Sequence, residues 1–191
     1  MKMTALEKHF VNKAAHARNV AERAVQLLER INPSPGWRYL DVGCGIGAAA
    51  SEIAKGGLLD VTGIDVDPKQ IVEAQRGVTG DNLHFRVMDA TGMDFRDGQF
   101  DIVATNMVTH HIPNWERAFS EMVRVLHTGG YLIYRDHVFP SWLARIGRQI
   151  LRFMGLPSAN AIESLAAKAG LTKIYELRQP RVVTAIWVKN A

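Results

Sequence analysis

Apolar side chains recur with helical spacing near the start of the chain. Over residues 5–31 they fall three or four positions apart, at Val20, Ala24, Leu27 and Ile31. With a charged opposite face, this spacing predicts an amphipathic helix. Two prolines and a glycine follow within residues 32–36, and residues of these types end helices. We therefore expect residues 1–36 to form an N-terminal helical segment.

From residue 39 onward, short apolar runs alternate with amphipathic stretches. The runs predict strands at residues 39–42, 61–65, 83–88, 100–105 and 131–135, then a hairpin of 174–177 and 182–188. The amphipathic stretches predict helices at residues 48–55, from Asp67-Pro68 onward, from Asn114 through Leu126 with Gly129-Gly130 closing it, and at 160–169. This alternation is typical of a parallel sheet covered on both faces, with the hairpin as an antiparallel edge. The predicted fold class is α/β.

Length and composition favour one globular domain. The chain has 191 residues, of which 47% are hydrophobic and 22% charged, and about 100–200 residues make a domain. The single cysteine, Cys44, excludes a disulfide framework within the chain and a four-cysteine zinc site. No apolar run approaches the ~20 residues that a membrane-spanning helix needs, and residues 1–18 lack an apolar secretion core. We expect a single domain over residues 1–191 in a cytoplasmic protein.

The net charge of +4 is unevenly distributed. After residue 134 there are nine lysines or arginines against three acids. A basic C-terminal third indicates an anionic partner, a membrane surface or a nucleic acid. An ordinary solvated surface is the alternative.

The first predicted strand runs into a glycine-rich turn at residues 41–47, Asp-Val-Gly-Cys-Gly-Ile-Gly. In open parallel sheets, ligands bind beyond the carboxyl ends of the strands, and glycines let the backbone turn sharply and approach a ligand. Residues 45–50 also fit a GxGxxA dinucleotide fingerprint. Asp41 favours another ligand, because its carboxylate would repel a pyrophosphate and suits an ammonium group. S-adenosylmethionine carries an ammonium, a sulfonium and a nucleoside, and no phosphate.

Two further acids follow later strands. Asp65 closes the strand at 61–65, where a carboxylate can accept both hydroxyls of a ribose, while Asp67 serves as the helix cap. Asp89 ends the next strand and can accept from an adenine amino group, or it is a turn residue. Acids at the ends of three successive strands favour a nucleoside ligand with a cationic tail.

At this point the chain resembles the class I S-adenosylmethionine-dependent methyltransferases, especially their small generic branch. The motifs that carry the resemblance are residues 41–47, 63–67, Asp89-Ala90, 100–103, His110-His111-Ile112, 124–126 and 129–132. His127-Thr128 departs from the Lys-Pro that such proteins often have before the glycine pair, which is a detail of the turn.

The resemblance implies a Rossmann-like, doubly wound, seven-stranded sheet whose last strand is antiparallel. It assigns Asp41 and the glycines to the methionine moiety, Asp65 to the ribose, and Asp89 with Ala90 to the adenine. The cofactor-binding residues that it implies are Asp41, Gly43, Cys44, Gly45, Gly47, Asp65, Val66, Asp89, Ala90 and Asn106.

Three histidines are candidates for the acceptor side. Methyl transfer from a sulfonium is an in-line displacement that gains much from positioning alone. A hydroxyl or thiol acceptor also benefits from a base, and His110, His111 and His137 lie after predicted strands. They are catalytic candidates, and a structural or cofactor-lining role is the alternative.

Residues 142–154 combine two faces at helical spacing. Three arginines recur at positions 145, 148 and 152, and Trp142, Ile146, Ile150 and Phe153 form an apolar face. This pattern is typical of a helix on a membrane surface, and it also suits a helix that covers the acceptor pocket. We expect residues 137–158 to be a pocket-covering insertion, with peripheral membrane contact through 142–154 as the second interpretation.

Missing motifs narrow the chemistry. Residues 106–109 are not the Asn/Asp-Pro-Pro-aromatic motif of nucleic-acid amino-methylating enzymes, and Cys44 is not placed for attack on cytosine. Because no carboxylate triad suggests magnesium, we expect no metal. A small-molecule or lipid-like methyl acceptor is predicted. RNA or protein methylation, a nicotinamide oxidoreductase and a non-catalytic S-adenosylmethionine-binding module remain alternatives.

Overall fold

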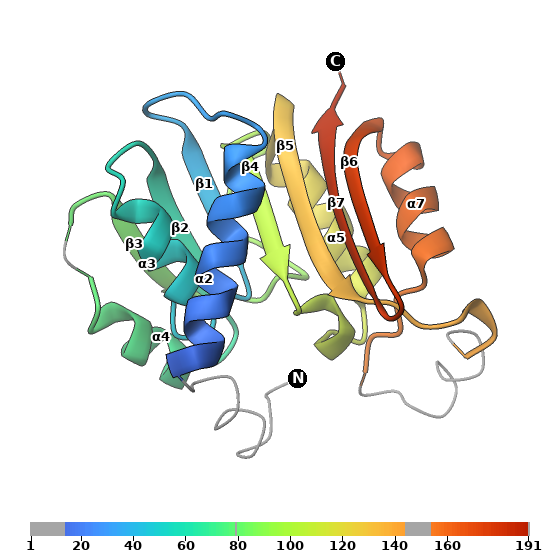
Figure 1. Ribbon diagram of the computed structural model, residues 1–191, viewed down its shortest axis with the longest axis horizontal. Helices are drawn as coiled ribbons and strands as arrows, with labels where there is room; N and C mark the ends of the chain where they lie inside the picture. Colours follow the sequence, from blue (N-terminus) through green and yellow to red (C-terminus); the bar gives the residue numbers. More distant parts are fainter. Residues whose placement is uncertain (1–13, 79, 144–153, 191) are drawn as a thin grey trace. The chain divides into compact units, whose positions relative to one another are not determined.

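The computed structural model describes residues 14–78, 80–143 and 154–190. Its strands form a seven-stranded sheet in the order β3-β2-β1-β4-β5-β7-β6 (Figure 1). This order, with an antiparallel C-terminal hairpin, confirms the predicted α/β class. The chain divides into two compact units, an N-terminal unit of residues 2–89 and a C-terminal unit of residues 90–191. One domain over residues 1–191 stays a prediction.

The N-terminal unit alternates helices and parallel strands. Its elements are α2 (Ala14–Glu29), β1 (Arg38–Val42), α3 (Ala48–Ala54), β2 (Asp60–Asp65), α4 (Pro68–Gln75) and β3 (Leu83–Val87). β2 pairs in parallel with both β1 and β3, and α2 packs along α3 (Figure 1). Leu40, Val42 and Val61 have no exposed surface, as expected of a parallel sheet that is covered rather than solvated. The predicted cap of α4 is confirmed, because the Asp67 carboxylate accepts from the Lys69 N–H at 3.0 Å.

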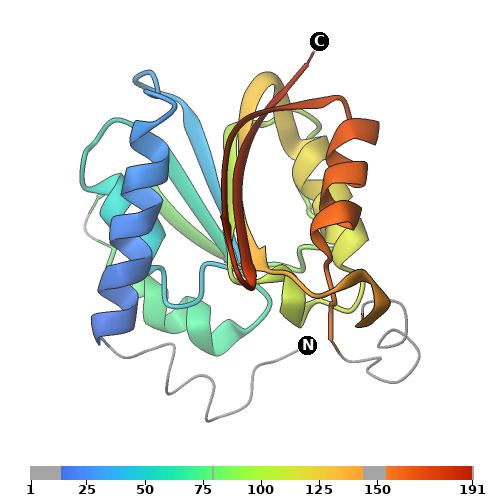
Figure 2. The ribbon, with the colours of Figure 1, turned by 45° about the vertical axis from the view of Figure 1, so that its right-hand side comes forward.

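The C-terminal unit ends in the predicted hairpin. Its elements are β4 (Phe100–Asn106), the short 3-10 helix η1 (Thr109–His111), α5 (Trp115–Val125), β5 (Leu126–His137), α7 (Ala159–Lys168), β6 (Leu171–Gln179) and β7 (Val182–Lys189). β7 runs antiparallel between β5 and β6. Helices α5 and α7 lie on the same side of these strands (Figure 2). Trp187 packs edge-on against Phe119 and Tyr134, with ring centroids 6.3 and 6.2 Å away, which forms the core of this unit.

The predicted boundary between α5 and β5 was wrong. The helix ends at Val125, the strand begins at Leu126 rather than Tyr131, and Asn114 makes no capping hydrogen bond through its side chain. The glycine pair does not separate the elements but lies in a bulge, since Phe100 pairs with Leu126 and Ile102 with Tyr131. A Cβ on Gly130 would meet the Asp101 carbonyl oxygen at 2.7 Å. Gly130 therefore serves a close approach of two strands, and Gly129 adopts a positive φ of 83° beside it. Local turn signals cannot distinguish this arrangement from a helix stop.

Two sequence predictions fall partly outside the described residues. The start of the predicted N-terminal helix, before residue 14, and most of the predicted helix at 142–154 lie there. Trp142 is described and is 64% exposed. Among the helices that the structure describes, none is both long and apolar enough to cross a bilayer.

Candidate functional site

Three glycines in the left-handed backbone conformation shape the loop between β1 and α3. Gly43, Gly45 and Gly47 have φ values of 75°, 55° and 78°, a conformation that side chains other than glycine rarely adopt. The loop is anchored to the end of β2, because the Gly43 and Cys44 N–H groups both donate to the Ile64 carbonyl at 2.8 and 2.9 Å. These φ values agree with the sharp turn that the sequence analysis expects of the glycines.

Asp41 is a buried acid just before this loop. Its side chain lies in β1, and the residue is 5% exposed. Burial, reinforced by the nearby Asp65 carboxylate, raises the pKa of Asp41 to about 7, against a stabilising hydrogen bond from the Ala50 N–H. Among the described residues, no cation contacts it. A cationic group of a bound ligand would supply the positive partner that stabilises the ionised form of this carboxyl.

Asp65 links the loop to the start of α4. One carboxylate oxygen accepts from the Gly45 N–H at 3.0 Å, and the other accepts from the Asp67 N–H at 2.9 Å. A carboxylate oxygen has two lone pairs and can accept more than one hydrogen bond. Val66, the next residue, is 40% exposed. The structure thus gathers Asp41, the glycine loop and Asp65 within the N-terminal unit.

The remaining cofactor candidates are more scattered. Asp89 is exposed and lies two residues beyond the end of β3, while Ala90 is buried at the start of the C-terminal unit. Asn106 ends β4, and its side-chain oxygen accepts from the Arg135 guanidinium at 3.1 Å. Cys44 is half-buried, and burial is the main reason that its thiol pKa is raised well above the usual value. The thiol therefore stays protonated, as a small loop residue would.

The three candidate histidines lie together in the C-terminal unit. The ring centroid of His110 is 4.0 Å from that of His111 and 4.9 Å from that of His137. The Nδ1 of His110 lies 2.5 Å from a carboxylate oxygen of Asp136, and Asp136 has no exposed surface. The pair comes from two elements, η1 and the end of β5, so the strand pairing of β4 with β5 brings it together.

Asp136 is surrounded by donors. Its second carboxylate oxygen accepts from the Thr109 hydroxyl at 2.6 Å and from the N–H groups of Thr109 and Val108 at 2.5 and 3.1 Å. The Tyr134 hydroxyl lies 2.6 Å from the Thr109 hydroxyl. Burial alone would raise the pKa of Asp136, but the hydrogen bonds from His110, Thr109 and the His137 N–H outweigh it and lower that pKa.

These contacts determine which nitrogen of His110 carries the proton. An ionised carboxylate can only accept, so Nδ1 of His110 is the donor, and Nε2 of the neutral ring is an acceptor. His110 makes no other side-chain hydrogen bond to the residues that the structure describes. Our sequence reasoning missed Asp136 and Thr109. The available signal was an acid at the end of an apolar strand, the same signal that singled out Asp41.

One described end of the predicted insertion contacts the histidine segment. The Gly155 N–H donates to the His110 carbonyl at 3.1 Å, and the Phe139 N–H donates to the Pro157 carbonyl at 2.9 Å. Any side chain at position 155 would collide with the Thr109 and Ile112 carbonyl oxygens. The insertion is therefore packed closely against η1 at Gly155, and its two described ends are joined to each other.

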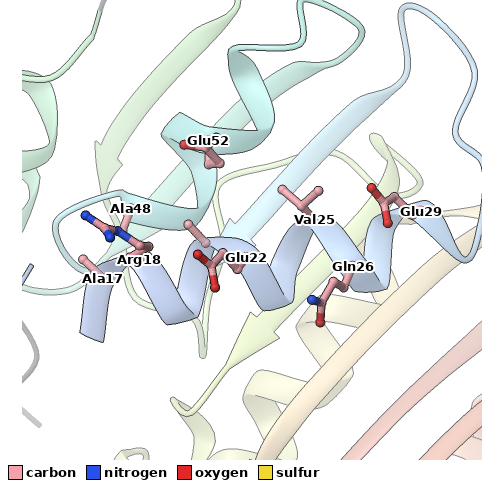
Figure 3. Close-up of a pocket in the computed structure, with 9 residues that line it drawn as sticks. Ala17, Arg18, Glu22, Val25, Gln26, Glu29, Ala48 and Glu52 are labelled. Carbon is pink, nitrogen blue, oxygen red and sulfur yellow. The ribbon is translucent and has the colours of Figure 1, made fainter. Parts of the chain in front are cut away.

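The N-terminal unit also carries an open pocket between α2 and α3 (Figure 3). Its described lining includes three acids, Glu22 and Glu29 on α2 and Glu52 on α3, beside Arg18. None of the predicted cofactor residues lines it. Within the described ranges, no group of three or more metal-ligating side chains is arranged to hold a metal ion.

Comparison with known proteins agrees with this architecture. A family model described as a methyltransferase domain matches residues 40–134, about half of the chain. The 2-methyl-6-phytyl-1,4-hydroquinone methyltransferase of Synechocystis sp. is 33% identical over 162 residues, which cover 80% of this chain and 50% of that protein. An O-methyltransferase of Pyrenophora dematioidea is 30% identical over 167 residues, covering 81% and 62%. The chain thus spans about half to three-fifths of the length of these relatives.

A solved structure shares the fold. Geranyl diphosphate C-methyltransferase from Streptomyces coelicolor A3(2), in complex with Mg²⁺, geranyl diphosphate and S-adenosyl-L-homocysteine, matches with a TM-score of 0.74 and 14% identity. The match covers 93% of this chain and 86% of that one. The sheet order, the loop after β1 and the matched family model together show that the chain belongs to the class I S-adenosylmethionine-dependent methyltransferases.

Proposed function

We propose that the chain transfers a methyl group from S-adenosylmethionine to a small-molecule or lipid-like acceptor that carries a hydroxyl, with His110 as the general base. The observation that carries the choice of acceptor is the 2.5 Å contact between His110 and the buried Asp136. A base of this kind is useful where a proton must leave the nucleophile, as from a phenol or an alcohol.

The N-terminal unit supports the choice of cofactor. Asp41, with its pKa raised to about 7 and no cation beside it among the described residues, fits the ammonium of the methionine moiety. Asp65, whose carboxylate accepts from the N–H groups of Gly45 and Asp67, is proposed for the ribose hydroxyls, and the open space at Gly45 leaves room for a ligand. Val66, Asp89 and Ala90 are proposed for the nucleoside, with Gly43, Cys44, Gly47 and Asn106 completing the proposed cofactor set. The Streptomyces coelicolor relative was solved with S-adenosyl-L-homocysteine.

When bound, S-adenosylmethionine supplies a methyl group on an activated sulfonium. The chain's own contribution, in this proposal, is to remove a proton. Asp136 remains ionised because its donors lower its pKa, and its carboxylate orients His110 through Nδ1. The Nε2 atom then accepts the hydroxyl proton of the acceptor, and the charge that develops on the ring is stabilised by Asp136. Such a base contributes about 10²–10⁴-fold in rate.

The names of two relatives support the proposed acceptor class. The name of the Synechocystis relative describes a ring with two hydroxyls and a phytyl chain, and the Pyrenophora relative is an O-methyltransferase. The proposed acceptor has a weakly acidic hydroxyl on a largely apolar body. Peripheral membrane contact through 142–154 and a cytoplasmic location stay predictions, as does nucleic acid as the less favoured partner.

The test follows the methyl group. The protein is incubated with S-adenosylmethionine labelled in the methyl group and, separately, with pools of phenolic metabolites, lipids, RNA and protein. We expect label in a hydroxylated small molecule or lipid. Label in RNA or protein alone, or no binding of S-adenosylhomocysteine by calorimetry, would overturn the proposal.

A further inference from the structure

A chain of hydrogen bonds runs from Tyr134 to His110 inside the C-terminal unit. The Tyr134 and Thr109 hydroxyls are 2.6 Å apart, and the Thr109 hydroxyl donates to one carboxylate oxygen of Asp136 at 2.6 Å. The other carboxylate oxygen lies 2.5 Å from Nδ1 of His110. Tyr134, Thr109 and Asp136 have no exposed surface. The chain therefore connects two buried hydroxyls to the proposed base.

The protons in this chain can point in only one direction. An ionised carboxylate only accepts, and a threonine hydroxyl has a single proton to donate. Because the Thr109 proton is donated to Asp136, the Tyr134 hydroxyl must donate to the Thr109 oxygen. Every hydrogen bond of the chain therefore points toward the carboxylate, from Tyr134 on one side and from His110 on the other.

The hydroxyl side of the chain favours the ionised form of Asp136. Burial raises the pKa of this carboxyl, and the hydrogen bonds from His110 and Thr109 are among the causes that lower it. A hydrogen bond to the charged form favours that form, and hydrogen bonds in a chain polarise one another. Tyr134 therefore strengthens the donor that Thr109 presents to Asp136.

We propose that Thr109 and Tyr134 are positioning residues for methyl transfer, which act through Asp136 to keep Nδ1 of His110 protonated and Nε2 free to accept a proton. The inference rests on the proposed function, in which His110 is the base. A protonated Asp136 would donate to Nδ1, and the neutral ring would then carry its proton on Nε2, where it cannot serve as a base. The two hydroxyls oppose that exchange.

Other ionisable groups lie on the segments around the pair. Those of η1, the last four residues of β5, the first turn of α5 and the β6–β7 turn are His111, Tyr134, Arg135, His137, Glu116, Arg117 and Arg181. The rings of His111 and His137 contact His110 with centroids 4.0 and 4.9 Å away. Within the described ranges, however, His110 is the only side chain that forms an ion pair with Asp136. The hydroxyl chain is therefore the main side-chain influence on this carboxylate besides His110.

The test removes the two hydroxyls one at a time. Thr109→Val and Tyr134→Phe each delete one hydroxyl, whereas Thr109→Ser keeps it. Thr184→Val is the matched control, because Thr184 is a buried threonine on the neighbouring strand β7. The tautomer of His110 is read from the NMR chemical shifts of its ring nitrogens in the ligand-free proteins. Turnover with a hydroxylated acceptor is measured across pH, and binding of S-adenosylhomocysteine is measured by calorimetry.

We expect Thr109→Val to lower turnover about 10- to 100-fold, the loss of one hydrogen bond to a charged group. The acidic limb of its pH–rate profile should move to higher pH by about one unit, because Asp136 without this donor binds a proton more tightly. The ring of His110 should carry more of its proton on Nε2. Tyr134→Phe should change each quantity in the same direction and by less. Thr109→Ser and Thr184→Val should resemble the wild type, and cofactor affinity should stay unchanged throughout.

Unchanged pH–rate profiles and ring-nitrogen shifts in Thr109→Val and Tyr134→Phe would overturn the inference. A loss of turnover that Thr109→Ser does not restore would also overturn it, since that result indicates packing rather than the hydroxyl. If Thr109→Val does not fold, Tyr134→Phe decides by the same measurements. A wild type whose His110 carries its proton on Nδ1, but which methylates no hydroxylated acceptor, would instead overturn the proposed function.

Discussion

The two units each bury one aspartate near the carboxyl end of an apolar strand, yet the two side chains behave oppositely. Asp41 lies next to the last residue of β1 and is 5% exposed, and Asp136 lies next to the last residue of β5 and has no exposed surface. The pKa of Asp41 is raised to about 7, mainly by burial, whereas the pKa of Asp136 is lowered. Burial is therefore not what distinguishes them.

The difference lies in the partners that the fold supplies. Asp136 accepts from a histidine, a threonine hydroxyl and several backbone N–H groups. Asp41 has one backbone donor at Ala50 and a second carboxylate, Asp65, nearby. A carboxylate whose donors are built in holds another side chain in place. A carboxylate without them favours a positive group from outside, which is why we assign Asp136 to positioning and Asp41 to ligand binding.

Removing the histidine that Asp136 holds should have the largest effect. In His110→Gln, turnover should fall about 10²–10⁴-fold, because the base is lost while the cofactor residues remain. His84→Gln is the control, since His84 is an exposed histidine on β3. Turnover with an identified acceptor and calorimetry with S-adenosylhomocysteine are measured on each protein.

An equal loss of cofactor affinity and turnover in His110→Gln would contradict its role as a base. That result would indicate a structural or cofactor-lining histidine instead. We expect at least one of His110, His111 and His137 to behave in this second way.

The second prediction concerns stability against pH. The folded-state pKa of Asp41 is raised from 3.8 to about 7, so its contribution to stability is present at low pH and is lost as pH rises towards 7. Asp41→Asn cannot ionise. At pH 8 the ligand-free variant should therefore be more stable than the wild type, by up to about 4 kcal/mol, and the difference should shrink at pH 5.

Denaturant unfolding of both proteins at pH 5 and pH 8 measures this difference. The free energy of unfolding of the Asn variant should be the less pH-dependent of the two. A variant that is less stable at pH 8 would mean that the Asp41 carboxylate already has a favourable partner in the free protein, and the contrast with Asp136 would disappear.

The third prediction is that the same substitution weakens cofactor binding. Asp41→Asn, and separately Asp65→Ala, should each cost about 1–3 kcal/mol in affinity for S-adenosylmethionine, the range for hydrogen bonds to charged groups. Because a bound ammonium favours the ionised carboxylate, wild-type affinity should also rise as pH increases through about 7, the pKa of Asp41. Calorimetric titrations across pH test both points, and pH-independent, unchanged affinities would remove Asp41 from the site.

The sequence predicted what local chemistry determines. The Asp67 cap, the sharp glycine turn at Gly43 and Gly45, and the terminal hairpin all depend on residues close together in the chain. Parallel alternation of strands and helices was enough for the fold class.

What could not be predicted depends on distant pairs. His110 and Asp136 are 26 residues apart and meet only because β4 pairs with β5. The bulge at Gly129-Gly130 is determined by the backbone of the neighbouring strand β4. In the sequence alone, the same two glycines are indistinguishable from a helix stop. The Asp65 carboxylate joins the N–H of Gly45 to the N–H of Asp67, and such a link is invisible until the side chains are placed.

The smallest predicted effect on stability is that of Gly45→Ala, which tests whether the ligand-free loop already has the conformation that binds the cofactor. Gly45 has a φ of +55°, and the nearest atom to an added Cβ would be 3.9 Å away. Gly45→Ala should therefore cost only the backbone strain, about 1–2 kcal/mol of stability. Gly36 provides the matched control, because it has a φ of +80° and open space around it, and Gly36→Ala should show a similar loss of stability.

Only the Gly45 variant should also lose cofactor affinity, and Gly45→Val should abolish binding in a protein that still folds. Equal cofactor affinities for Gly36→Ala and Gly45→Val would place the ligand away from this loop. In that case Asp41 would be an unsatisfied acid with no ligand to balance it, and its contrast with Asp136 would need another cause.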